Sequence, residues 1–175
     1  MLNGDTETIK NSKYIEKYPY QIGMIWIMGI LYKIFNCTNY RLLQCLNIVA
    51  NIITFIFMYL IFKKMSKKYE VNEIVYWVMC LTFVPLVLLT TYVYGDYIGM
   101  ALSTIGIYYI MNYKEKGKSI NLVISSIAMA LAYITKTNYL ILILAILIYL
   151  VMYLIQDISK KEKERIIKSI MCIII

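Results

Sequence analysis

The stretch "RLLQCLNIVANIITFIFMYLIFKKMSKK", residues 41–68, decides the fold of this chain. Residues 41–62 are mostly apolar and would make a helix of about 33 Å, long enough to cross a hydrocarbon layer of about 30 Å. Four lysines follow directly: Lys63, Lys64, Lys67 and Lys68. Because basic residues collect on the cytoplasmic side of membrane helices, we expect this segment to span the membrane with its C-terminal end in the cytoplasm.

The composition of the whole chain agrees with this interpretation. Of its 175 residues, 61% are hydrophobic and only 16% are charged, which is more apolar surface than a soluble core of this length could hide. The sequence therefore predicts an all-α, multi-pass integral protein of the cell membrane. We expect a polar extracytoplasmic leader, residues 1–20, followed by a single transmembrane domain, residues 21–175.

The net charge and the metal-binding residue types limit the possible partners. A net charge of +8 fits contact with anionic membrane lipids, and nucleic acid is a poor alternative in so apolar a chain. The four cysteines lack metal-ligand spacing and the sequence has no histidine, which excludes a Cys/His metal site. No cofactor is indicated, and a divalent metal has no support from any motif.

Further apolar runs follow the first span, separated by short polar loops: residues 71–94, 98–112, 119–134 and 139–155. Pro85 predicts a kink in the first of them. Alternating spans would place twelve of the 18 basic residues in the cytoplasm: the four lysines above, Lys114, Lys116, Lys118, Lys160, Lys161, Lys163, Arg165 and Lys168. The sequence thus predicts a bundle of about five spanning helices.

Two shorter apolar segments flank this bundle. Residues 21–35 would form a helix of only about 22 Å, so an interfacial or re-entrant helix is favoured over a span. Residues 166–175 begin another span and stop before half of it is complete. These features predict a chain that is incomplete at both ends.

Small residues recur at four-residue spacing in two of the predicted spans. Gly99 with Ser103, and Ser126 with Ala130, would let these helices approach their neighbours closely. We interpret both pairs as packing positions.

Two charged residues stand out at the predicted extracytoplasmic side. Asp96 is the only acid between two apolar segments, and two interpretations are open: a functional carboxylate, or the cap of a helix that begins near Tyr97. Lys136 is a lone cation on a side where lysine is disfavoured. It either extends to the membrane surface or binds a lipid phosphate.

The order of several motifs resembles the GT-C superfamily of membrane glycosyltransferases, which includes protein O-mannosyltransferases and the lipid A aminoarabinose transferase. Tyr18-Pro19-Tyr20-Gln21 leads into residues 21–35 and then to Arg41, similar to the family's first extracytoplasmic loop. "YVYGDYIGMALSTIGIYYIM" resembles the family's acid at the head of the fourth span. "SSIAMALAYITKTNYLILILAI" resembles its small-residue helix that ends in a Thr-Lys pair.

This resemblance implies transfer of a sugar from a polyprenyl-phosphate donor at the extracytoplasmic face. Such transfer needs a carboxylate to accept the acceptor's proton and cations to hold the leaving phosphate. The implied substrate-binding residues are Tyr18, Pro19, Gln21, Asp96 and Lys136.

The resemblance does not assign the catalytic acid. Family members carry it before the Tyr-Pro stretch and after a first span that is missing here. Asp5 is the nearest candidate, and it lies too close to Tyr18 to take that role by position. We therefore expect a fragment of a transferase.

A second hypothesis is a non-enzymatic polytopic membrane protein, such as a flippase or transporter component or an assembly partner. A transporter would place ionisable residues near the middle of the membrane at broken helices. This sequence places its acids at the ends of the apolar runs, which favours the enzyme.

Overall fold

The computed structural model describes residues 13–69, 71–92, 95–159, 167 and 170. Every regular element in those residues is a helix, which confirms the all-α prediction for this part of the chain. Asp5 and nearly all of the predicted C-terminal segment, residues 166–175, lie outside the described residues. The helices are α2 (Lys13–Lys17), η1 (Pro19–Gln21), α3 (Ile22–Phe35), α4 (Arg41–Tyr69), α5 (Glu73–Thr82), α6 (Pro85–Leu88), η2 (Leu89–Thr91), α7 (Asp96–Lys116), α8 (Ser119–Thr135) and α9 (Tyr139–Ser159).

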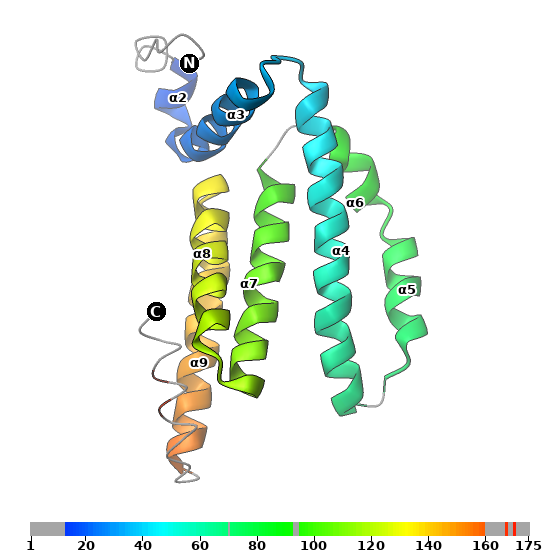
Figure 1. The fold of residues 1–175 in the computed structure, drawn as a ribbon, viewed down its shortest axis with the longest axis vertical. Helices are drawn as coiled ribbons and strands as arrows, with labels where there is room; N and C mark the ends of the chain where they lie inside the picture. The colour runs from blue at the N-terminus through cyan, green and yellow to red at the C-terminus, as the bar shows by residue number, and fades with distance from the viewer. Residues whose placement is uncertain (1–12, 70, 93–94, 160–166, 168–169, 171–175) are drawn as a thin grey trace.

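The long helices form a bundle in which α7 lies between α4 and α8, and α9 lies against α8 (Figure 1). Helices α4 and α7 run in the same direction, and α8 runs in the opposite direction (Figure 1). Because successive helices reverse direction, the start of α7, the end of α8 and the start of α9 meet at one end, which is also where α3 lies (Figure 1). We call this the α3 end; it holds Asp96, Thr135 and Tyr139. The opposite end, where α4 and α7 finish, holds Lys64 and Lys116, and we call it the lysine end.

Among the described residues, two helices are long and apolar enough to cross a membrane by length and composition: Arg41–Lys67 within α4 and Tyr139–Gln156 within α9. The apolar helices α5 and α8 are shorter, and the 21 residues of α7 include several small and polar side chains that are buried in the bundle. The predicted number of about five spans is therefore not confirmed. The long apolar helices still fit a helical membrane protein.

Exposed apolar side chains cover much of the bundle. Leu81 is 79% exposed and Ile141 is 73% exposed, and many other large apolar residues point outward. Surfaces of this kind are unfavourable in water and suit contact with lipid.

The run over residues 71–94, predicted to be one span with a kink at Pro85, is divided in its described residues into the separate helices α5, α6 and η2. α5 ends at Thr82, and Pro85 is the first residue of the short α6, so the helix is interrupted where only a kink was expected. Proline is favoured at the first position of a helix because it has no N–H to donate and its φ is already helical. Here it starts a new helix instead of bending an existing one.

Three amides of α4 compensate for this break. Gln44, Asn47 and Asn51 lie on one face of the helix, at spacings of three and four residues. Their side chains donate to backbone carbonyls of the broken segment: Gln44 to Thr91 (3.0 Å), Asn47 to Thr90 (3.2 Å) and Tyr92 (2.7 Å), and Asn51 to Leu86 (3.1 Å). Irregular backbone is tolerated at membrane depth only when protein groups satisfy its carbonyls. The amides therefore fix the segment that leads into Asp96.

The packing of small residues follows the prediction in α7 and departs from it in α8. Gly99 and Ser103 are buried as expected. Ser126 is only half-buried and Ala130 is exposed, so the second pair was wrong. The buried face of α8 carries Ser125, Ala128 and Ala132 instead, and the Ser125 hydroxyl donates to the carbonyl of Gly106 at 2.8 Å.

Helix α3 lies across the end of α8 and does not run alongside it (Figure 1). The two helices touch at Gly23, where an added Cβ would lie 1.7 Å from the carbonyl oxygen of Ile134. Only glycine allows this approach. A short helix across the end of the bundle is the arrangement that the interfacial prediction for residues 21–35 requires.

Candidate functional site

An ion pair joins two of the predicted site residues at the α3 end. Lys136 Nζ lies 2.5 Å from Asp96 Oδ1, although the two residues are far apart in the sequence. Asp96 begins α7, and Lys136 directly follows the last residue of α8. Their side chains are 45% and 28% exposed, so the pair is open to ligands from solvent or from the membrane surface.

The structure corrects the capping interpretation of Asp96. The N-cap residue of α7 is Gly95, and no side chain donates or accepts a capping hydrogen bond there. The Asp96 carboxylate reaches across to the neighbouring helix instead. It still lies in the first turn of α7, where the helix dipole favours a negative charge.

Tyr139 is a part of this site that the sequence did not reveal. Its hydroxyl donates to the backbone carbonyl of Asp96 at 2.7 Å. Its ring lies against Gly99, where an added Cβ would be 2.1 Å from the nearest ring carbon. The available signal was Gly99, which spacing identified as a packing position without naming its partner.

A cavity of about 810 Å³ opens beside the ion pair. The N-terminal segment contributes Tyr18, Tyr20, Gln21 and Met24 to its lining, and the ends of α7 and α8 contribute Gly95, Thr135, Lys136 and Asn138. Three predicted site residues, Tyr18, Gln21 and Lys136, therefore line one cavity. They come together because α3 is fixed across the end of α8 at Gly23.

Asp96 lies at the edge of a second, smaller cavity of about 480 Å³. Its other walls are largely apolar and include Phe83, Leu86 and Met100. Asp96 thus lines one cavity while its side chain pairs with a lysine that lines the other.

Pro19 is the predicted site residue that neither cavity includes. It is exposed and is the first residue of η1, in which the Gln21 N–H donates to the carbonyl of Tyr18 at 3.1 Å. The rings of Tyr18 and Tyr20 meet edge to face, with centroids 5.9 Å apart. Pro19 therefore shapes the turn that presents its neighbours to the larger cavity.

The described residues contain no group of three or more His, Cys, Asp or Glu side chains that could hold a metal ion. Cys37, Cys45 and Cys80 are free thiols away from the larger cavity. The polar groups that the described residues bring to the site are the Asp96 carboxylate, the Lys136 ammonium group and the hydroxyl and amide groups around them.

The family model of dolichyl-phosphate-mannose-protein mannosyltransferases matches residues 19–175. The chain belongs to this family. The match supports the resemblance to the GT-C membrane glycosyltransferases, and it covers both residues of the ion pair. No curated protein and no solved structure matches the chain.

The chain is thus a member of a family of membrane glycosyltransferases. The ion pair and the cavity beside it bring charged, aromatic and amide groups together with residues that the sequence motifs indicated. This convergence makes the α3 end the candidate site.

Proposed function

We propose that this family member binds a polyprenyl-phosphate sugar donor at the α3 end, on the extracytoplasmic side, and takes part in transfer of the sugar. The observation that carries the proposal is the Asp96–Lys136 pair at the rim of the larger cavity. The family description names dolichyl phosphate mannose, a polyprenyl-phosphate sugar, which supports this donor class. The lysines at the opposite end support the orientation, because basic residues favour the cytoplasmic side.

Lys136 contacts the phosphate of the donor. During transfer the acceptor attacks the anomeric carbon and gives its proton to a carboxylate base, the bond between that carbon and the phosphate oxygen breaks, and negative charge grows on the phosphate. An ammonium group that is already in position stabilises this charge without reorganising. The Asp96 carboxylate holds the Lys136 ammonium group in place before the donor binds, and the Tyr139 hydroxyl holds the backbone of Asp96.

Each of the two cavities suits a different chemical part of the donor. The larger one offers the rings of Tyr18 and Tyr20 and the amides of Gln21 and Asn138, which suits a sugar. The smaller one, with Phe83, Leu86 and Met100, suits the first isoprene units. The phosphate then lies near the ion pair, between the sugar and the lipid.

Photocrosslinking tests donor binding independently of sugar transfer. The probe is a polyprenyl phosphate with a diazirine in its first isoprene units, added to the purified chain in detergent. Lys136→Gln should reduce specific labelling by about tenfold, because a hydrogen-bonded charge pair is lost, whereas Lys136→Arg should retain most of it.

Lys118→Gln is the matched control, since it removes one exposed lysine at the opposite end of α8. It should leave the labelling unchanged. Equal labelling of the wild type and the Lys136→Gln variant would overturn the proposal.

A further inference from the structure

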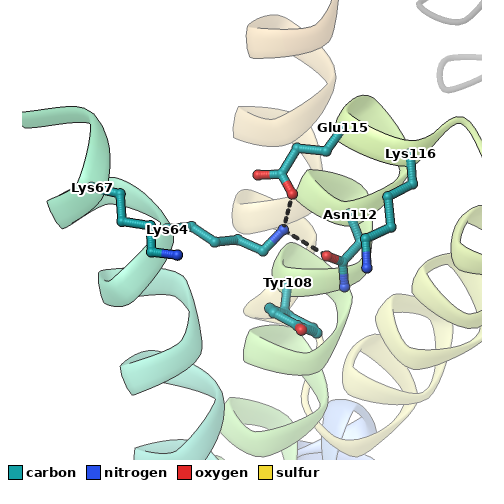
Figure 2. A pocket seen from close by; sticks show the side chains of 6 residues that line it. All are labelled: Lys64, Lys67, Tyr108, Asn112, Glu115 and Lys116. Atoms are coloured by element: carbon teal, nitrogen blue, oxygen red, sulfur yellow. Dashed lines mark hydrogen bonds and ion pairs between the residues drawn. The ribbon is translucent and has the colours of Figure 1, made fainter.

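A second cluster of charges surrounds a cavity of about 530 Å³ at the lysine end, far along the bundle from the candidate site. Figure 2 shows the side chains that line it, which come from the last turns of α4 and α7: Lys64, Lys67, Tyr108, Asn112, Glu115 and Lys116. Three lysines and one carboxylate leave a net positive charge on its walls.

Lys64 is fixed in the wall of this cavity. Its Nζ donates to Asn112 Oδ1 at 2.6 Å and pairs with Glu115 Oε2 at 2.5 Å (Figure 2). The same nitrogen lies 5.3 Å from the centroid of the Tyr108 ring. The Lys64 side chain is only 17% exposed, so its charge and that of Glu115 compensate each other inside a network that joins α4 to α7.

Lys67 and Lys116 are different from Lys64. Both are exposed, they extend from opposite helices into the same cavity, and within the described residues neither lies within 4.0 Å of a carboxylate (Figure 2). Two ammonium groups that share a cavity repel each other. A bound anion would remove that repulsion.

The position of the cavity indicates which anion. The stretch of α4 that is long and apolar enough to cross a membrane ends at Lys67. If this stretch spans, the cavity opens at the level of the lipid headgroups, where phosphate is the abundant anion. Phosphate also matches two lysine ammonium groups in charge and hydrogen-bonding capacity.

We propose that the cavity between the ends of α4 and α7 binds the phosphate of an anionic phospholipid. Lys67 and Lys116 contact the phosphate, and Lys64 is a fixed part of the cavity wall. The bound headgroup joins the two helices at this end, as the amides of α4 join α4 to the broken segment nearer the other end. This site is independent of donor binding at the α3 end, because it shares no residue with it.

Native mass spectrometry of the purified chain in detergent tests the proposal. The probes are dioleoyl phosphatidylglycerol and, as a neutral reference, dioleoyl phosphatidylcholine. The wild type should retain phosphatidylglycerol in preference, and Lys67→Gln/Lys116→Gln should lose it by about tenfold. The charge-retaining variant Lys67→Arg/Lys116→Arg should keep most of the binding.

The matched control is Lys63→Gln/Lys118→Gln, which removes two exposed lysines from the same end outside the cavity. It should change binding by less than about twofold. Equal losses in the two glutamine double variants, or no loss in either, would overturn the site, because the lysines would then act only as surface charge.

Inorganic phosphate separates the two sources of the anion. If the site takes a headgroup, millimolar phosphate should leave the phosphatidylglycerol adducts of the wild type in place. Displacement by phosphate would support an anion site at the same lysines and overturn its assignment to a lipid. A thermal unfolding scan of each variant checks that the fold is retained.

Discussion

The hydroxyl of Tyr139 donates a hydrogen bond of 2.7 Å to the backbone carbonyl of Asp96, the residue whose side chain pairs with Lys136. One residue at the start of α7 is therefore held from two directions, by the turn after α8 and by the first residue of α9. The carboxylate is positioned by three segments that meet only in the folded bundle.

Replacement of Tyr139 by Phe should loosen this junction without disturbing its packing. The ring against Gly99 remains, and the hydrogen bond to the Asp96 carbonyl is lost. We expect a loss of about 1 kcal/mol in the free energy of unfolding, measured by denaturant titration in detergent micelles. A loss as large as that of Tyr139→Ala would contradict this account, because the hydroxyl would then contribute more stability than one hydrogen bond supplies.

A charge exchange separates the stability of the ion pair from its function. Because the Lys136 and Asp96 side chains are 28% and 45% exposed, each single neutral variant should cost less than about 1 kcal/mol of stability. The double variant Asp96→Lys/Lys136→Asp should recover only part of the thermal stability, because each charge then lies at the unfavourable end of its helix, and it should not recover the crosslinking to polyprenyl phosphate. Recovery of both would mean that the position of the ammonium group does not matter.

Gly23→Ala should displace α3 and disrupt the larger cavity. An added methyl group would lie 1.7 Å from the Ile134 carbonyl oxygen, which cannot move without disturbing the end of α8. We expect at least about 2 kcal/mol of destabilisation and loss of donor crosslinking. Gly29→Ala in the same helix is the control, and it should be neutral or slightly stabilising because alanine favours the helix. Equal effects of the two changes would contradict the contact between α3 and α8.

Asn47→Leu tests how α4 supports the broken segment. It removes both hydrogen bonds from the buried Asn47 amide to the carbonyls of Thr90 and Tyr92 and puts an apolar group in its place. We expect a loss of about 2 to 3 kcal/mol, seen as a lower unfolding midpoint. Gln44→Leu, which removes a single bond nearer the helix end, should cost clearly less. The reverse order would refute this account of the break.

The sequence predicted most helices well because hydrophobic runs and lysine clusters report directly on helix length and ends. The expected segment 119–134 became Ser119–Thr135, and 139–155 became Tyr139–Ser159. The break at Pro85 could not be predicted in the same way. It depends on whether other helices can satisfy the freed carbonyls, and the amides of α4 that do so are distant in the sequence.

For the candidate site, the sequence suggested residues but not their arrangement. The motif order indicated Tyr18, Gln21, Asp96 and Lys136, and the structure brings them to one end of the bundle. The pairing of Asp96 with Lys136 was not predicted, since both have plausible local partners in a helix cap and a lipid surface. The contribution of Tyr139 required the helix register of α9 against α7.

The central claim is that the ion pair and its cavity face the outside of the cell, where the proposed lipid-linked sugar would be used. Sidedness labelling tests it most directly, with Asn138→Cys at the cavity and Ser119→Cys at the lysine end, in a chain whose four native cysteines are replaced by serine. A membrane-impermeant maleimide should label the cysteine at 138 in intact cells and the cysteine at 119 only after permeabilisation. The opposite pattern would contradict the account, because the proposed donor site would then face the cytoplasm.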